Sequence, residues 1–244
     1  MIIIPAIDIR GGKCVRLFKG DFEKETVYFE NPAEAAEKWE SEGGEFLHLV
    51  DLDGARTGEP KNLAVVKEIL SKVKIPAELG GGIRDMAHIE EVLSLGVNRV
   101  ILGSVAVKNP ALVKEACKTY GGDKIVVGID AKDGVVAVEG WGVSGDIKAV
   151  ELAKRMKDAG VTTVIYTDIS RDGTLKGVNA KETAKLAKES GLKIIASGGV
   201  SSLRDIEILK EYEKDGIEGV IVGKSIYTGS LNLNEAVKIA KRGE

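Results

Sequence analysis

The chain has 244 residues, with 35 lysines and arginines against 38 aspartates and glutamates, so its formal charge at pH 7 is −3. Hydrophobic residues make up 43% and charged residues 30%, a balance that excludes an intrinsically disordered chain. The 30 glycines are about 12% of the chain against roughly 7% in ordinary proteins, and no Gly-x-y period accompanies them, which excludes collagen. We therefore expect the surplus glycines in turns, at close backbone contacts or beside a ligand.

Charge and cysteine content exclude further classes of protein. The mildly acidic balance argues against a general nucleic-acid binder, which ordinarily carries a basic face, but not against a small anionic ligand. Cys14 and Cys117 are too few for a disulfide framework or a zinc site, and they favour a reducing, cytoplasmic compartment. No apolar run approaches about 18 residues, and no basic flank precedes the short N-terminal run, so we expect neither a membrane span nor a signal peptide.

Short apolar runs alternate with amphipathic segments along the chain. Most runs are rich in isoleucine and valine without polar alternation, as is typical of strands buried on both faces of a parallel sheet. The amphipathic segments carry helix signals, such as Asn31-Pro32 before the first and Gly43-Gly44 after it. In chain order, we predict eight strand–helix pairs: strand 2–7 and helix 32–43, 46–50 and 62–73, 75–79 and 85–95, 99–102 and 110–120, 125–129 and 146–159, 162–166 and 179–190, 193–196 and 202–210, and 219–222 and 232–241.

Eight such units in one chain without a linker predict an α/β fold, a single-domain (β/α)8 barrel spanning residues 1–244, with a doubly wound sheet as the alternative. The sequence also repeats at about half its length. Residues 6–12 resemble 128–134, residues 80–83 resemble 197–200, and residues 100–104 resemble 220–224. We therefore predict a twofold repeat of two half-barrels, approximately 1–122 and 123–244.

Two repeated aspartates are the strongest candidates for chemistry. Asp8 and Asp130 follow the first and fifth predicted strands, which lie opposite each other in an eight-stranded ring whose active site is at the carboxyl ends of the strands. Two facing carboxyl groups suit acid–base catalysis, in which one donates a proton and the other accepts one. A single aspartate in such a place more often caps a loop, but the symmetric pair favours catalysis.

Glycine-rich loops follow the third, fourth, seventh and eighth predicted strands. Glycine lets backbone N–H groups approach an anion, and the loops after strands 7 and 8 are a common phosphate site in barrels. Tight turns alone would explain either pair of loops, but two symmetric pairs favour a ligand with two phosphates. The candidate residues are Gly81, Gly82, Arg84, Gly103 and Ser104 in the first half, and Ser197, Gly198, Gly199, Gly223 and Lys224 in the second.

The loop after the sixth predicted strand places Thr167 and Asp172, with Gly173, on the rim of the barrel. Asp51 and Asp168 follow strands 2 and 6, and we interpret both as structural. The two histidines, His48 in mid-strand and His88 on a helix, are placed for neither a histidine triad nor a metal site. Trp141 lies in the long loop after the fifth strand, where it either packs down or stacks on a flat heteroaromatic ring.

Taken together, these motifs resemble the HisA family of histidine-biosynthesis isomerases over essentially the whole chain. The motifs that carry the resemblance are Pro5-Ala6-Ile7-Asp8, the run 48–55, Gly80-Gly81-Gly82-Ile83-Arg84, Gly140-Trp141, the run 194–200 and Ile221-Val222-Gly223-Lys224. The resemblance implies a fusion of two half-barrels and a small-molecule substrate with a phosphate at each end. It implies an Amadori rearrangement, aminoaldose to aminoketose, with no metal and no organic cofactor.

The resemblance also implies roles for individual residues. Asp130 would protonate the ribose ring oxygen as general acid, and Asp8 would remove the C2 proton as general base. Thr167 would hydrogen-bond near the acid, while Arg16 and Trp141 would hold the substrate in a closed state. We expect a monomer that binds neither nucleic acid nor membrane.

Three alternatives stay open at this point. The cyclase of the same pathway is a similar half-barrel fusion, but its usual opening Cys-Leu-Asp-Val-Lys-Asp-like motif is absent here. A dual-specificity isomerase also acts on phosphoribosyl anthranilate, but it carries an arginine where this chain has Glu139, which would repel the anthranilate carboxylate. A non-catalytic barrel that binds a phosphometabolite is the third, and the opposed aspartates count against it.

Overall fold

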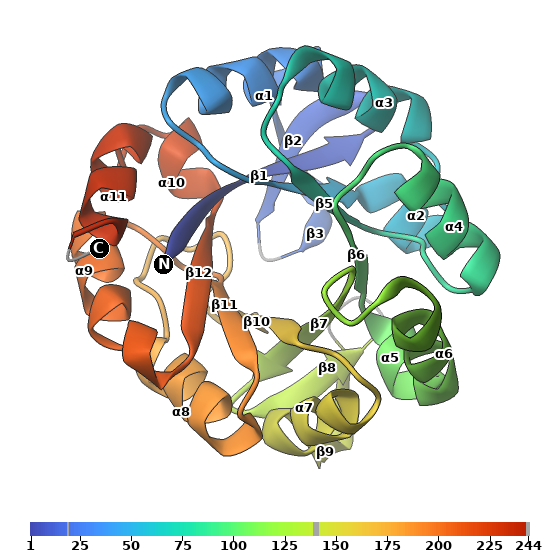
Figure 1. Cartoon of the computed structure of the whole chain (residues 1–244). Coiled ribbons are helices and arrows are strands. Elements are labelled where there is room, and N and C mark those ends of the chain that lie inside the picture. Colours follow the sequence, from blue (N-terminus) through green and yellow to red (C-terminus); the bar gives the residue numbers. More distant parts are fainter. Residues whose placement is uncertain (19, 139–141, 243–244) are drawn as a thin grey trace.

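The computed structural model in Figure 1 is a closed ring of eight parallel strands surrounded by helices, so the predicted (β/α)8 barrel is confirmed. It describes residues 1–18, 20–138 and 142–242, without the side chains of Val138 and of residues 142–146. Parallel pairing runs around the whole ring, and pairing of β7 with β10 closes it. The ring strands are β1 (Ile2–Arg10), β4 (Leu47–Asp51), β5 (Ala77–Gly80), β6 (Arg99–Leu102), β7 (Ile125–Lys132), β10 (Thr163–Asp168), β11 (Lys193–Ser197) and β12 (Ile217–Val222).

The helices form the outer layer, and local capping sets their first residues. Asn31 accepts a hydrogen bond from the Ala33 backbone N–H, and Pro32 occupies the first helical position of α1, as predicted. The long helices are α1 (Pro32–Ser41), α3 (Leu63–Lys72), α4 (Met86–Ser94), α6 (Pro110–Tyr120), α7 (Ala149–Asp158), α8 (Ala180–Ser190), α9 (Leu203–Glu211) and α11 (Leu233–Ala240). The short ones are α2 (Leu52–Thr57), α5 (Ser104–Lys108), α10 (Lys224–Tyr227) and the 3₁₀ turn η1 (Glu213–Asp215).

Two antiparallel hairpins extend the barrel in a way that the sequence did not predict. β2 (Lys13–Phe18) and β3 (Asp21–Phe29) continue from β1, while β8 (Val135–Val138) and β9 (Gly142–Lys148) continue from β7. Helix α7 therefore begins at Ala149 rather than at residue 146, because residues 146–148 belong to β9. The two strands that carry the candidate catalytic aspartates, each two residues before its last residue, thus lead directly into a hairpin.

Apolar side chains pack on both sides of the ring of strands. The larger cluster lies between strands and helices and includes the fully buried Trp39. The smaller one fills the barrel interior with inward-facing isoleucines and a few small residues, so that the barrel is packed and not a pore. Its largest members are Ile4, Ile101, Ile165, Ile195 and Ile221. None of the helices in the described part of the chain has both the length and the apolar character that crossing a membrane requires.

Asp51 and Asp168 brace equivalent loops in the two halves of the chain. The Asp51 carboxylate accepts backbone hydrogen bonds from Gly54 (2.8 Å) and Lys61 (2.6 Å) and a side-chain bond from Asn62 (2.7 Å). The Asp168 carboxylate accepts a bond from the Asn179 side chain (2.8 Å), again eleven residues further along the chain. This matched geometry supports the prediction of two half-barrels, whose division into residues 1–122 and 123–244 stays a proposal.

Gly81 lies against the loop that Asp51 braces, and we expect its substitution by alanine to damage the fold. Its φ is +108°, and an added Cβ would lie 2.1 Å from the Asp51 carbonyl oxygen. Gly96 has a similar φ of +95° but open space around it. An alanine at Gly96 therefore measures the cost of the backbone conformation alone, without a steric clash. Gly96→Ala should lower the free energy of unfolding by about 1–2 kcal/mol, and Gly81→Ala by several kcal/mol more. Equal losses in urea unfolding would show that the close contact is unimportant.

Candidate active site

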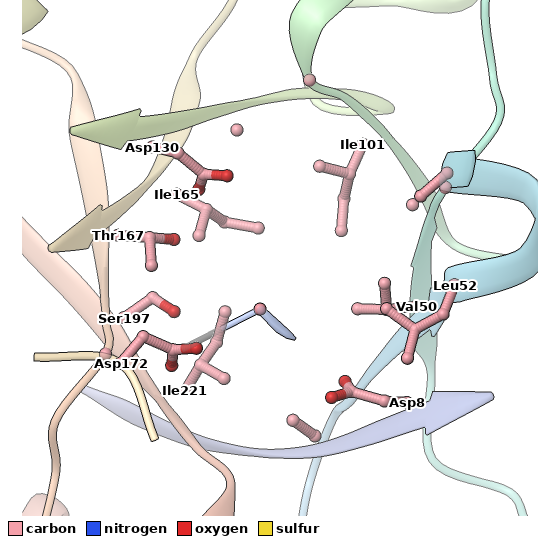
Figure 2. A pocket seen from close by; sticks show the side chains of 18 of the residues that line it. Asp8, Val50, Leu52, Ile101, Asp130, Ile165, Thr167, Asp172, Ser197 and Ile221 are labelled. Carbon is pink, nitrogen blue, oxygen red and sulfur yellow. The ribbon is translucent and has the colours of Figure 1, made fainter. Parts of the chain in front are cut away.

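A cavity of about 670 Å³ opens at the carboxyl ends of the ring strands. Figure 2 shows Asp8 and Asp130 pointing into it from opposite walls, with Thr167 next to Asp130 and Asp172 further along the same side, beyond Ser197. Strands β1 and β7, which carry the first two, are separated by three strands on either side of the ring. The two carboxylates therefore face each other across the space in which a ligand would lie.

Asp8 is paired with a buried guanidinium. Arg16 comes from β2, and its Nη1 lies 3.0 Å from Asp8 Oδ2. Among the described residues, neither Nε nor Nη1 of Arg16 has an acceptor in hydrogen-bond geometry, and both atoms are buried, so the ion pair with Asp8 is the close contact of Nη1. Burial lowers the pKa of Arg16, but the carboxylates of Asp8 and Asp172 offset this and the net shift is upward. Arg16 therefore carries a permanent positive charge beside the candidate base.

Thr167 lies directly beside Asp130 because their strands pair in register. The parallel pairing of β10 with β7 sets Thr167 opposite Asp130, and both residues line the cavity. The apolar Ile165 lies two residues earlier on β10, one layer deeper in the barrel. The candidate acid and the threonine thus form one polar patch above an apolar floor.

Asp172 is a third carboxyl group in the cavity, on the loop after β10. Burial raises its pKa to about 6, and the negative charges of Asp8 and Asp130 add to that shift while Arg16 opposes it. Asp172 therefore changes its charge in the physiological pH range. A carboxyl group with such a shift in a cavity is typical of functional sites.

We expect Asp172→Asn to stabilise the protein at neutral pH, because ionisation of Asp172 is unfavourable in the folded state. Its pKa is 3.8 in the ordinary case and about 6 here. Below about pH 3 both the folded and the unfolded chain hold the proton, so the variant gains little there. Well above pH 6 both have lost it, and the pKa shift corresponds to a gain of about 2–3 kcal/mol. Urea unfolding at pH 4.5 and pH 7.5 measures the difference, and a gain that shrinks with rising pH would contradict it.

The glycine loops line the cavity, but four of their glycines also make close contacts with neighbouring loops. An added Cβ on Gly82 would lie 2.6 Å from the Glu59 carbonyl carbon, and one on Gly199 would lie 2.5 Å from the Gly177 oxygen. An added Cβ on Gly198 would lie 2.8 Å from the Asp168 carbonyl oxygen, and one on Gly81 would be closer still to that of Asp51. Bulkier residues there would disturb the loops themselves, so these positions do not give a clean test of phosphate binding.

The other two loop glycines differ from each other. An added Cβ on Gly103 would have no atom within 4 Å, and Gly103 lines the cavity. Gly223 is covered by Arg16, whose Nη2 would lie 2.2 Å from an added Cβ. Arg84 covers Gly58, the residue after α2, in a similar way. An arginine therefore lies close to glycine backbone near each proposed phosphate end.

Lys224 follows β12 at the second proposed phosphate end, where it contacts the loop after β10 and the β2–β3 hairpin. We expect Lys224→Met to weaken substrate binding. The Lys224 Nζ donates a hydrogen bond to the Gly173 oxygen (3.1 Å) and lies 5.2 Å from the centre of the Phe18 ring. The variant loses one charge-assisted hydrogen bond from the Lys224 ammonium to a substrate phosphate. This loss should raise KM by about 10- to 100-fold with a smaller change in kcat. The control is Lys188→Met. Lys188 is an exposed lysine on the outer helix α8, and it pairs with Asp215 of η1. Equal KM values for both variants would show that Lys224 does not bind phosphate.

The structure brings together every predicted site residue that it describes. Trp141 and Glu139 lie outside the described residues. Among the described residues, no group of three or more histidine, cysteine, aspartate or glutamate side chains is arranged to hold a metal ion. The residues that line the cavity are Asp8, Arg16, Gly81, Gly82, Arg84, Gly103, Ser104, Asp130, Thr167, Asp172, Gly173, Ser197, Gly198, Gly199, Gly223 and Lys224.

Sequence reasoning missed His48 and Arg56, which line the same cavity. From the sequence, His48 is assigned only a place in mid-strand. Its position two residues before Val50, another cavity residue, gives it the same inward direction on β4, and this period-2 pattern is the signal that identifies it. Arg56 lies on α2, a short helix that no periodicity predicted.

The ring, the position of the cavity and the facing carboxylates place this protein among the (β/α)8-barrel enzymes. The chain belongs to the histidine biosynthesis protein family, whose model matches residues 2–232.

Three bacterial relatives carry the name 1-(5-phosphoribosyl)-5-((5-phosphoribosylamino)methylideneamino)imidazole-4-carboxamide isomerase. The relatives from Trichlorobacter lovleyi and Geobacter sulfurreducens are each 56% identical over 243 residues, and the one from Heliobacterium modesticaldum is 51% identical. Each match covers 100% of this chain and 99% of the relative.

Proposed function

We propose that this protein is the isomerase that its relatives are named for, converting the aminoaldose ribotide of histidine biosynthesis into its aminoketose isomer by an Amadori rearrangement. The observation that carries the proposal is the pair of opposed carboxylates, Asp8 and Asp130, in the cavity of a chain 56% identical over its full length to such isomerases. The relatives' name describes two 5-phosphoribosyl groups, and hence two phosphates. Two glycine loop pairs with Arg84 and Lys224 at opposite ends of the cavity suit such a substrate.

Asp130 begins the reaction as general acid. It gives its proton to the ribose ring oxygen, the bond from C1 to that oxygen breaks, and the nitrogen lone pair forms a protonated imine with C1. Thr167, beside Asp130 in the register of β7 and β10, orients the group by hydrogen bonding. Proton transfer by a positioned side chain contributes about 10²–10⁴-fold to a rate.

Asp8 continues the reaction as general base from the opposite wall. The cationic imine makes the C2 hydrogen acidic, and the Asp8 carboxylate removes it as a proton. The electrons of the C2–H bond form a C1=C2 double bond, and those of the imine return to nitrogen. The resulting enolamine gains a proton at C1 and loses the hydroxyl proton at C2, which gives the ketose. Arg16, whose Nη1 lies 3.0 Å from Asp8, holds the base in place.

Product analysis tests the proposed function. The purified protein is incubated with the aminoaldose alone, without ammonia or added cofactor, and the mixture is analysed by mass spectrometry and chromatography. We expect one new species of unchanged mass, the ketose isomer. Two smaller products that appear only with ammonia would show a cyclase, and binding without conversion would show a non-catalytic barrel.

A further inference from the structure

His48 presents one ring nitrogen to the cavity and is held by the other. Its Nδ1 lies 2.8 Å from Glu78 Oε1, and its side chain, which lines the floor of the cavity, is 13% exposed. A carboxylate can only accept a hydrogen bond, so Nδ1 carries the hydrogen and Nε2 keeps its lone pair in the neutral ring. Among the described residues, Nε2 has no hydrogen-bond partner.

Glu78 is itself fixed by a buried arginine. Its side chain is fully buried on β5, and Arg99 Nε donates a hydrogen bond to its Oε2 at 2.8 Å. The Arg99 guanidinium lies 4.5 Å from the centre of the Phe46 ring, and its Nη1 is 3.9 Å from Glu218 Oε2. Rotation of the imidazole would therefore break its bond to the Glu78 carboxylate, because Arg99 and burial hold that carboxylate in place.

Apart from Glu78 and Arg99, the surroundings of His48 on the cavity floor are apolar or small. In the parallel register of β1 and β4 it lies opposite Ala6, two residues before Asp8 on β1. Ile101, Ile165 and Ile221 line the rest of the floor. Ligand cavities are mostly apolar, with a few placed polar groups that orient the ligand. The imidazole is such a group, one layer below the candidate base.

We propose that His48 contacts the substrate from the floor of the cavity, with Nε2 accepting a hydrogen bond from a ribose hydroxyl between the two phosphates. Glu78 and Arg99 are positioning residues that select the ring tautomer and its direction. The inference rests on the proposed function for the identity of the substrate, whose phosphoribosyl groups supply the hydroxyls. A purely structural ion network would instead need only the bond from Nδ1 to Glu78.

Two substitutions of His48 separate these roles, because asparagine and glutamine amides replace different ring nitrogens. His48→Asn places its amide near Nδ1 and keeps the bond to Glu78, but leaves the cavity side without an acceptor. His48→Gln reaches toward the position of Nε2. We expect His48→Asn to raise KM about tenfold, the loss of one net hydrogen bond of about 1.4 kcal/mol, with kcat changed less than about twofold. His48→Gln should stay within about threefold of the wild-type KM.

The opposite order, with His48→Gln impaired and His48→Asn normal, would overturn the inference, and so would a wild-type KM in both. Glu78→Gln gives a second test through a double-mutant cycle. It should raise KM in the wild-type background but not in His48→Asn, while lowering the melting temperature in both. An equal KM effect in both backgrounds would show that Glu78 does not act through His48.

Turnover by the wild-type protein is the reference for both tests, which keeps the two proposals distinguishable. If the wild type does not convert the aminoaldose, the proposed function fails. Calorimetry then gives the dissociation constant of the same aminoaldose for each variant. The contact of His48 predicts weaker binding by His48→Asn and near-normal binding by His48→Gln. If the wild type converts it and the His48 variants show the contradicting order, only this inference fails.

Discussion

Asp8→Asn is expected to lower kcat by about 10²–10⁴-fold while substrate binding and folding are retained. Asparagine has the shape of aspartate, but its amide does not accept the C2 proton. Arg16 then lies beside a neutral group, yet it keeps the charge that attracts an anionic ligand. Steady-state kinetics give kcat, and calorimetry gives the dissociation constant for the aminoaldose.

Asp21→Asn is the matched control for Asp8→Asn. Asp21 is an exposed carboxylate on the same β2–β3 hairpin as Arg16, it pairs with Lys24, and it lies outside the cavity. This variant should have the kcat of the wild type. Turnover by Asp8→Asn within about tenfold of the wild type would show that another group removes the proton.

Asp130→Asn should lower kcat by a similar factor, for the complementary reason. Without a proton on the ring oxygen, the C1–O bond must break to release an alkoxide, and the imine does not form. General acids and bases shape opposite limbs of a pH–rate profile. The residual activity of Asp130→Asn should lack the alkaline limb, and that of Asp8→Asn should lack the acidic limb.

Exchanged limbs would reverse the two assignments while keeping both residues in the mechanism. Unchanged kcat in Asp130→Asn would remove Asp130 from it. Asp172 contributes its own titration, because its pKa lies at about 6. Each profile is therefore compared with that of the same variant carrying Asp172→Asn.

The fold was predictable because parallel barrel strands are buried on both faces. Runs such as that ending at Val222 contain few polar residues, and each is followed by an amphipathic segment, so the eight units stand out. The hairpins were not predictable in this way. Residues of β3 such as Glu23 and Glu25 are exposed, and an exposed hairpin needs no apolar run.

The site was predictable where position after a strand decides it. Asp8 and Asp130 follow from strand order, because strands 1 and 5 of any eight-membered ring are opposed. The ion pair of Arg16 with Asp8 depends on a hairpin that carries no strong signal. The network of Glu78 and Arg99 depends on the register between strands, which residue types do not determine.

The glycines illustrate the same limit. Their number indicates that the backbone needs space, but distances decide what fills it. At Gly81 that space is taken by the Asp51 carbonyl oxygen, and at Gly223 by the Arg16 side chain. At Gly103 it is open to the cavity. The same residue type therefore serves packing in one loop and lines a ligand cavity in the next.

The fate of the C2 hydrogen tests the central claim most directly. Proton NMR follows this signal of the aminoaldose during incubation with the wild-type protein and, in parallel, with Asp8→Asn. With the wild type, the C2 hydrogen signal should disappear as the C1 methylene of the ketose appears. With Asp8→Asn, which still binds the substrate, it should persist. Loss of the C2 hydrogen at the same rate in both samples would contradict the assignment of Asp8 as the base of an aldose–ketose isomerisation.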